Sequence, residues 1–238
     1  MNTKRWIIAA IALLVILAAI GFLSWHSAAK PAAPAFPIDK NDVISSWTFT
    51  GVDTATSSAA KAKADIARLT GLLGKGQYDD YDIYIGIGND EVLLGDGKAA
   101  YDAYDRAIAR YPSQGLAYTD MAALMNDLGA THTALTAYET AAAVQPAVFE
   151  YAIQWISYLT RTFPNETALV DQAFAFAKAH YGDTPQILTL KAGWQTEEGQ
   201  YAAAIATWKQ VEALAPGGNS AAINAEIARL TAKEAAAP

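Results

Sequence analysis

Apolar and small residues recur along residues 81–218 at spacings typical of paired helices, and the same set returns after 34 positions. The first set comprises Tyr84, Ile87, Gly88, Gly95, Ala100, Tyr104, Ala107 and Pro112. Each member has a counterpart 34 residues later, at Tyr118, Met121, Ala122, Gly129, Ala134, Tyr138, Ala141 and Pro146. A later copy comprises Leu188, Ala192, Gly199, Ala204, Trp208, Val211 and Pro216. A repeat of this length predicts a stack of helix pairs.

Close packing explains why these residue types share the pattern. Small residues such as Gly88 and Ala122 let two helices approach, and aromatic side chains fill the space opposite. The repeated glycine, first seen at Gly95, allows the tight turn inside each pair, and a proline ends the second helix. No pair buries its apolar face alone, so a core forms only when neighbouring pairs stack.

A divergent copy fits between Pro146 and the later set. Residues 147–182 lack the turn glycine and the closing proline, and we expect helices near 147–162 and 165–181. Pro164 favours a turn between them, with Asn165 as the N-cap of the second helix. The triplet from Asn165 to Thr167 also matches a glycosylation acceptor, but helix capping is the favoured interpretation.

In these motifs residues 81–218 resemble the tetratricopeptide repeat (TPR) family. The four repeats span 81–114, 115–146, 147–182 and 185–218. The resemblance implies an all-α fold, a right-handed superhelix of stacked antiparallel helix pairs. It also implies that the first helices of the pairs line a concave groove that binds partners. Repeats of this kind do not identify the partner.

Helical patterns on both sides of the repeats indicate capping helices. The N-terminal cap, residues 57–80, contains a helix over 57–74 that starts at Ser57 or Ser58. Its apolar face comprises Ile66, Leu69 and Leu73. The C-terminal cap spans residues 219–238 and shields the last repeat from solvent. Its apolar face comprises Ile223, Ile227 and Leu230.

Residues 43–51 alternate in polarity, which predicts an extended segment. One side of this segment comprises Val43, Ser45, Trp47 and Phe49. We expect it to pack against the first helix and to close that end of the stack. A short strand presented to a partner is the alternative.

The first 25 residues contain an uncharged apolar run from Trp6 to Leu23. As a helix this run spans about 27 Å, close to the thickness of a bilayer core. Lys4 and Arg5 precede it, so the positive-inside rule places the N-terminus in the cytoplasm and the body outside. We expect residues 1–25 to form a retained membrane anchor. A cleaved signal peptide is the alternative, and it also sends the body across the membrane.

Residues 26–56 follow the apolar run as a proline-rich stalk and the extended segment. Pro31, Pro34 and Pro37 are spaced by three residues, which favours an extended spacer. We expect this spacer to hold the folded body away from the bilayer.

Charge is distributed unevenly along the chain. The formal net charge is −7, from 17 basic and 24 acidic residues. Residues 1–40 contain four of the bases and one of the acids, so the remainder carries a net charge of −10. An acidic body repels nucleic acid, which we exclude as a partner. The chain has no cysteine, and this excludes disulfides and thiolate chemistry.

No motif in the chain indicates catalysis, and we expect no enzyme activity, metal or cofactor. His132 lies in the turn between the helices of the second repeat and His180 near a helix end, 48 residues apart and without a helix-spaced partner for a metal. Three acids, Asp79, Asp80 and Asp82, precede a helix. The dipole of the helix N-terminus stabilises the negative charge of carboxylates there. No phosphate loop, nucleophile elbow or zinc-protease helix occurs.

The groove that the resemblance implies is mildly acidic. By register it contains Asp82, Ile85, Asn89, Thr119, Asp120, Asn126, Asp127 and Glu197. Some TPR proteins bind a partner's C-terminal carboxylate with lysines and asparagines in the groove, but the lysines are absent here. Asn89 and Asn126 could form hydrogen bonds with the backbone of an extended peptide. The acidic groove favours partner segments that are neutral or basic. The alternative is that these residues are only solvated helix faces.

We therefore expect a membrane-anchored scaffold or adaptor in the extracytoplasmic space of a bacterial envelope, with protein or peptide partners. One alternative is a chaperone-like holding factor for secreted or membrane-assembly clients, in translocon, pilus or cytochrome biogenesis. An envelope hydrolase is a further alternative, and it would require a carboxylate pair that the sequence does not reveal.

Overall fold

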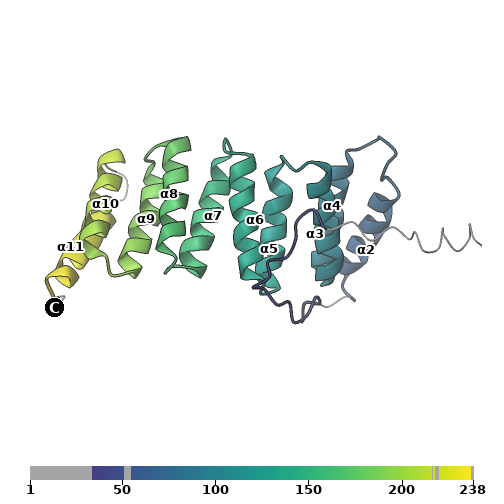
Figure 1. The fold of residues 1–238 in the computed structure, drawn as a ribbon, viewed down its shortest axis with the longest axis horizontal. Helices are drawn as coiled ribbons and strands as arrows, with labels where there is room; N and C mark the ends of the chain where they lie inside the picture. Colours follow the sequence, from purple (N-terminus) through teal and green to yellow (C-terminus); the bar gives the residue numbers. More distant parts are fainter. Residues whose placement is uncertain (1–33, 51–54, 216, 218–219, 237–238) are drawn as a thin grey trace, which may run out of the picture. The chain divides into compact units, whose positions relative to one another are not determined.

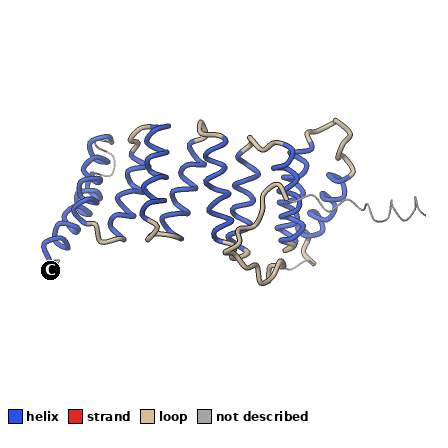
Figure 2. Tube along the Cα trace, in the orientation of Figure 1, coloured by secondary structure: helices blue, strands red, loops and turns tan. Residues whose placement is uncertain are grey.

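A computed structural model describes residues 34–50, 55–215, 217 and 220–236, and helix is the only regular element within them (Figures 1 and 2). The helices in chain order are α2 (Ser57–Thr70), α3 (Asp80–Leu94), α4 (Gly97–Arg110), α5 (Gly115–Asp127), α6 (Thr131–Val144), α7 (Phe149–Thr162), α8 (Thr167–Tyr181), α9 (Pro185–Glu197), α10 (Tyr201–Leu214) and α11 (Ser220–Ala236). The prediction of an all-α fold is confirmed for this part of the chain.

The predicted anchor and the first part of the stalk fall in residues 1–33, outside the described residues. Among the helices that are described, none combines the length and the apolar character needed to cross a bilayer.

The helices pack chiefly against helices adjacent to them in the chain (Figure 1). Every predicted repeat range holds one helix pair, with α3 beginning one residue early at Asp80. The turn glycines Gly95, Gly129 and Gly199 have φ of 79°, 79° and 70°. Only glycine adopts this left-handed conformation without strain, so the predicted role of these glycines is confirmed.

The core consists of small residues of one helix facing aromatic residues of another. Ala100, Ala122, Ala134, Ala192 and Ala204 have no exposed surface. At Gly88 the ring of Tyr104 lies so close that a Cβ atom would overlap it. Helices therefore approach each other only because the small residues recur every 34 positions.

Residues 34–50, which we call the strap, run across the second helices α4 and α6 (Figure 2). Asp105 on α4 accepts a hydrogen bond from the Phe36 backbone N–H at 2.7 Å, and the Tyr101 hydroxyl donates to the Phe36 carbonyl at 2.7 Å. Further along, the Asp39 N–H donates to the Thr133 hydroxyl of α6 at 2.9 Å. The strap thus joins the first repeat to the second.

Aromatic side chains anchor the strap. Phe36 is buried and contacts Tyr118 edge-on at 5.6 Å between ring centroids, and Trp47 contacts Tyr101 at 5.5 Å. The Gly97 N–H donates to the Trp47 carbonyl at 2.8 Å, which aligns the end of the strap with the turn between α3 and α4. Edge-on ring pairs of this kind add to the energy of burial.

The expected packing of residues 43–51 against the first helix, α2, is wrong. The described part of this segment contacts α4 and the turn before it instead, because Tyr101 supplies a ring contact to Trp47 and the Gly97 N–H donates to the Trp47 carbonyl. Val43, expected on the packed side, is 84 % exposed. Phe49 and Trp47 do pack against the core.

Helix α2 starts at Ser57, as predicted, but ends at Thr70 and not at residue 74; the Thr56 hydroxyl caps it by accepting from the Ala59 N–H at 3.1 Å. The expected N-cap of α8 is wrong. Glu166, and not Asn165, occupies the N-cap position of α8, and no side chain caps that helix. His132 lies in the first turn of α6 and not in the preceding loop.

Candidate protein-binding face

The first helix of each repeat carries one stripe of exposed and half-buried residues spaced i, i+4, i+7 and i+11. This spacing keeps side chains on one side of a helix. The first-helix stripe comprises Asp82, Gly86, Asn89 and Leu93 on α3; Leu116, Asp120, Ala123 and Asp127 on α5; Glu150, Gln154, Ser157 and Arg161 on α7; and Gln186, Leu190, Gly193 and Glu197 on α9. The stripe therefore repeats through all four pairs.

Five of the eight residues predicted for the groove lie in the first-helix stripe: Asp82, Asn89, Asp120, Asp127 and Glu197. Asn126 is exposed beside the stripe, where its amide donates to the Asp127 carboxylate at 3.3 Å. The structure thus brings most of the predicted residues to the same side of their helices. Their role in binding stays a prediction.

The placement of Ile85 and Thr119 on this face is wrong, since each is only 8 % exposed. The Thr119 hydroxyl donates to the Leu116 carbonyl of its own helix at 2.8 Å. One residue along a helix turns a side chain by about 100°, which is enough to move these two positions from the stripe into the core. The residue after each, Gly86 or Asp120, takes the stripe position instead.

Asn89 is already engaged within the protein. The Tyr104 hydroxyl donates to its Oδ1 at 2.7 Å, so the side-chain oxygen has a partner. The amide N–H groups are left to donate to another molecule. Asn89 can therefore offer hydrogen-bond donors to a peptide carbonyl but has a structural role as well.

Sequence reasoning missed the two large apolar residues of the stripe that are exposed. Leu93 is 61 % exposed and Leu116 is 45 % exposed. The search for groove residues considered polar side chains, whereas the helical spacing i, i+4, i+7 and i+11 from Asp82 leads to Leu93 without any structure. These leucines place two exposed apolar side chains in an otherwise acidic stripe.

Asp120 has an unusual environment for a carboxylate. It is half-buried on α5, and its Oδ2 atom lies away from solvent without a hydrogen-bond partner among the described residues. Burial raises the pKa of Asp120 to about 6. Burial, and to a smaller extent the charge of Asp120, raise the pKa values of the buried Tyr104 and the half-buried Tyr138.

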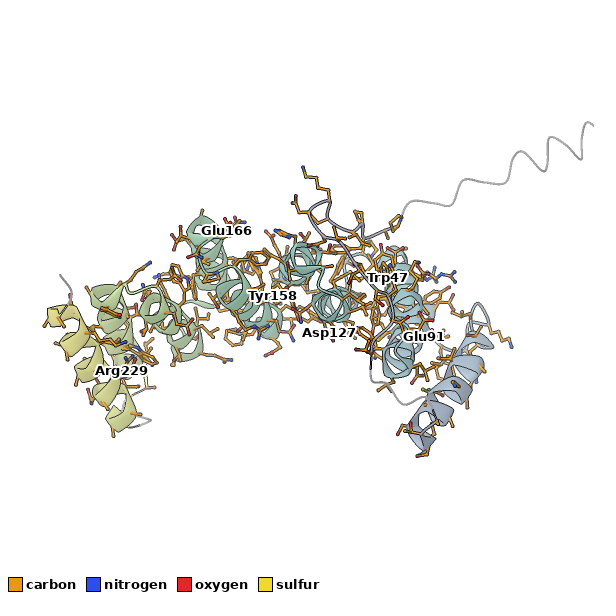
Figure 3. All side chains as sticks on the ribbon, turned by 90° about the horizontal axis from the view of Figure 1, so that it is seen from below. Trp47, Glu91, Asp127, Tyr158, Glu166 and Arg229 are labelled. Carbon is orange, nitrogen blue, oxygen red and sulfur yellow. The ribbon has the colours of Figure 1, made fainter. Side chains whose placement is uncertain are left out.

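The opposite side of the first two pairs is already occupied by the chain itself. The strap lies on the second helices α4 and α6, and Figure 3 shows where Trp47 of the strap and Asp127 of α5 lie. The stripe of α3 is also partly covered, because Leu69 of α2 lies against Gly86. The exposed stripe residues of α5, Leu116, Ala123 and Asp127, are therefore the more accessible ones to a partner.

The histidines offer no metal site in the described part of the chain. The Nδ1 atom of His132 lies 3.1 Å from the Asp42 carboxylate, and His180 lies near the end of α8 with its ring 4.4 Å from that of Phe176. Within residues 34–50, 55–215, 217 and 220–236, histidine and acidic side chains form no group of three that could hold an ion. Asp79 caps α3 by accepting from the Tyr81 N–H at 2.9 Å, while Asp80 and Asp82, which were expected to precede the helix, lie in its first turn.

No family model matches the sequence, and no curated protein is found as a relative. Solved structures do match. The C-terminal part of a TPR repeat-containing protein from Cytophaga hutchinsonii aligns at a TM-score of 0.55 and 16 % identity, over 74 % of this chain and 70 % of that one.

Two further structures are similar at lower scores. A thermophilic TPR protein of Thermus thermophilus aligns at a TM-score of 0.45 and 17 % identity, over 72 % of this chain and 91 % of that one. Yeast Tom70 aligns at a TM-score of 0.39 and 14 % identity, over 71 % of this chain and 47 % of that one. The identities are too low to transfer partners or activities. With the 34-residue helix pairs and their glycine turns, the Cytophaga match shows that this chain has a TPR-like fold.

Proposed function

We propose that this protein is a membrane-anchored scaffold or adaptor that binds protein partners on the first-helix stripe. The observation that carries the proposal is the stripe itself, which repeats on α3, α5, α7 and α9 and bears exposed side chains on each of these helices. A TPR-like stack presents such a repeated surface to an extended partner, which contacts several repeats at once.

The anchor and the location belong to this proposal through the sequence. The uncharged run from Trp6 to Leu23 is long enough to cross a bilayer, and Lys4 and Arg5 favour a cytoplasmic N-terminus. The repeats then lie in the extracytoplasmic space, and the stalk separates them from the bilayer. A scaffold held in this way acts on partners at or near the membrane surface.

Site-specific photo-crosslinking tests the binding face. A photoreactive residue replaces Ala123 in the stripe of α5, and the matched control replaces Ala143, an exposed alanine of α6. We expect position 123 to capture a discrete protein partner in cells and position 143 to capture little. Efficient capture at position 143 with none at position 123 would contradict the proposed face.

Cysteine labelling tests the location. The chain has no cysteine, so a Ser113→Cys variant carries a single thiol in the exposed loop after α4. A maleimide that does not cross membranes should label this thiol in cells whose inner membrane is intact. Labelling only after the inner membrane is broken would place the repeats in the cytoplasm and overturn the extracytoplasmic location.

The exposed leucines favour a second candidate function, a holding factor for unfolded clients. Leu93 and Leu116 give the stripe apolar points that an unfolded chain can contact. This function predicts that the full-length protein slows aggregation of several unrelated unfolded proteins. It also predicts that changing both leucines to serine removes the effect. A single stoichiometric partner, captured from position 123, would instead support the scaffold.

A further inference from the structure

A cleft of about 330 Å³ opens between α8, α9 and α10, and we call it the α8–α10 cleft. Its lining includes Phe174 and Ala175 of α8, Ile187 and Leu188 of α9, and Thr207 and Gln210 of α10. None of these residues belongs to the first-helix stripe, so the cleft is a separate surface of the repeats.

The first two repeats hold the strap at the place that corresponds to this cleft. There the backbone N–H of Phe36 donates to Asp105 of α4, and the Phe36 carbonyl accepts from the Tyr101 hydroxyl. Tyr101 and Asp105 are the fifth and ninth residues of α4. The fifth and ninth residues of α8 are Asp171 and Ala175, and both line the cleft. The wall that α8 gives the cleft is therefore the counterpart of the wall that α4 gives the strap.

The floors of the two places correspond in the same way. The ring of Phe36 contacts Tyr118, the fourth residue of α5, at 5.6 Å between ring centroids. The fourth residue of α9 is Leu188, which lines the cleft. The strap then reaches α6 at Thr133, and the cleft is bounded by α10, the next second helix after α8. Because equivalent helices of the repeats build both places, the two places should accept the same kind of occupant.

The two places differ in what fills them. Phe36 is 7 % exposed and occupies the first place. The second place is open in the described structure. A cavity of about 150 Å³ in another protein holds a benzene molecule. The volume of about 330 Å³ therefore leaves room for an aromatic side chain.

A lysine in the cleft favours an aromatic occupant over an aliphatic one. The Lys191 ammonium lies 5.8 Å from the ring centroid of Phe174, and the ion pairs found among the described residues do not include it. Lys178 and Asp183, which also line the cleft, pair with each other at 2.8 Å. A ring that enters beside Phe174 meets the Lys191 cation, and aromatic faces attract cations.

The backbone of an occupant also finds an acceptor. Asp171 lies one turn before Ala175 on the same face of α8, and it is exposed. Its carboxylate can accept a backbone N–H as Asp105 does for Phe36. The cleft therefore offers a hydrogen-bond partner to an extended segment as well as space for a ring.

We propose that the α8–α10 cleft binds one aromatic side chain of an extended segment of a partner protein, as the first two repeats bind Phe36. The strap at the corresponding place is the observation that selects this partner, because it has an extended backbone, one buried ring and a hydrogen bond to an acid. The cleft shares no residue with the first-helix stripe, so this proposal does not depend on the function proposed above.

The test uses the full-length protein in nanodiscs of phosphatidylcholine, with the methyl groups of isoleucine and leucine labelled for NMR. The probe is an acetylated and amidated peptide, Pro-Ala-Phe-Pro-Ile, which has the sequence of residues 34–38. A comparison peptide has leucine in place of phenylalanine. We expect the phenylalanine peptide to shift the signals of Ile187 and Leu188 through its ring current. Its dissociation constant should be at least about twofold lower than that of the leucine peptide.

The strap provides an internal control. Ile38 packs against the core of the first two repeats, so its methyl signals report whether the chain's own strap stays in place. We expect these signals not to move when the peptide enters the α8–α10 cleft.

Substitutions locate the bound peptide. Ala175→Trp fills the cleft from an exposed position and should abolish the shifts at Ile187, whereas Ala143→Trp at an exposed position of α6 should retain them. Lys191 is the seventh residue of α9, and its counterpart on α5 is Met121. Lys191→Met should therefore keep binding and remove the preference for phenylalanine over leucine. Thermal melts check that each variant is folded.

Absence of shifts at Ile187 and Leu188, equal binding of the two peptides, or undiminished binding in Ala175→Trp would each overturn the proposal. Shifts at Ile38 alone would also overturn it, because the peptide would then compete for the place of the strap and not enter the cleft.

The strap of a second copy of this chain is the other source of an aromatic segment. The chain has no cysteine, so a variant with both Ala35→Cys and Ala175→Cys carries one thiol in the strap and one in the cleft. We expect no disulfide-linked dimers of this variant in membranes. Dimers linked between positions 35 and 175 would assign the cleft to a second copy and overturn a separate partner.

Discussion

Asp42 caps helix α6 at Thr133, a residue 91 positions later in the chain. Its Oδ2 atom accepts hydrogen bonds from both the backbone N–H and the hydroxyl of Thr133, each at 2.6 Å, and its Oδ1 atom accepts from the His132 N–H at 3.1 Å. Helix α6 has Ala130 at its own N-cap, and no side chain of that residue caps it. The strap therefore supplies the cap that the local sequence lacks.

Replacing Asp42 by alanine should lower the free energy of unfolding by about 1–3 kcal/mol, because the first turn of α6 loses its cap and the strap loses its attachment. Urea unfolding followed by circular dichroism measures the change. Asp102→Ala is the control, since Asp102 is half-exposed and pairs only with Lys98 on the surface. A loss as small as that of the control would show that the cap contributes nothing.

The contribution of Asp42 should disappear in acid. Burial alone raises the pKa of Asp42, but the hydrogen bonds from Thr133 and His132 outweigh it, so the pKa lies below its ordinary value of 3.8. A depressed folded-state pKa stabilises the fold above pH 3.8, and this stability is lost as the pH falls through the folded-state pKa. The difference in unfolding free energy between the wild type and Asp42→Ala should therefore be full at pH 7 and should shrink as the pH falls below 3.8. A gap of constant width would contradict the capping role.

Asp120 should have the opposite pH dependence. Its folded-state pKa of about 6 exceeds the ordinary 3.8, so ionisation costs stability above pH 6, and the cost vanishes below pH 3.8. Two pKa units correspond to at most about 3 kcal/mol. Asp120→Asn should therefore raise the free energy of unfolding at pH 8 and have little effect at pH 4. Asp171→Asn should raise it at neither pH, and a stabilisation by Asp120→Asn that is equal at both would contradict the burial of the carboxylate.

Two helical glycines of the first helices should respond in opposite directions to alanine. Gly88 faces the ring of Tyr104 without room for a Cβ atom, so Gly88→Ala should destabilise by about 1–3 kcal/mol through overpacking. Gly193 on α9 has nothing within 4 Å of an added Cβ atom, and Gly193→Ala should stabilise by about 0.5–1 kcal/mol through helix propensity. Thermal melts of the two variants test this. If both substitutions stabilised the protein, helix propensity alone would determine the effect, and the close contact at Gly88 would not matter.

Hydrogen exchange should report the attachment of the strap. In the wild type the Asp39 N–H donates to the Thr133 hydroxyl and should exchange slowly for a residue outside any helix. Thr133→Val keeps the shape of the side chain and removes the hydroxyl, so the Asp39 amide should exchange faster by at least about tenfold. The Phe49 amide, which donates to the Gly95 carbonyl, is the internal control and should change little. Unchanged exchange at Asp39 would mean that this hydrogen bond does not hold the strap.

The repeats themselves were predictable from the sequence. The 34-residue spacing of small, aromatic and glycine positions determines the helix pairs, because only small residues let the helices approach and only glycine adopts the φ of 79° at Gly95 and Gly129. These constraints act between residues close along the chain or one repeat apart. A periodic sequence therefore reveals them without coordinates.

The candidate site was predictable in part. Asp82 and Asp127 follow from the helical register, whereas Ile85 and Thr119 differ from true stripe positions by a single residue. The family pattern does not fix the rotation of a helix to within one residue, because half-buried and buried positions adjoin on its surface. Burial against the neighbouring helices decides that rotation.

The sequence by itself determined the pairing of helices, the glycine turns and the small residues of the core, since each rests on contacts that repeat every 34 positions. Only the tertiary structure decided where residues 34–50 lie and what caps α6. Asp42 lies outside the repeats and far from Thr133 in the chain, so their contact leaves no periodic signal. It exists because the folded stack brings an uncapped helix end next to a free carboxylate.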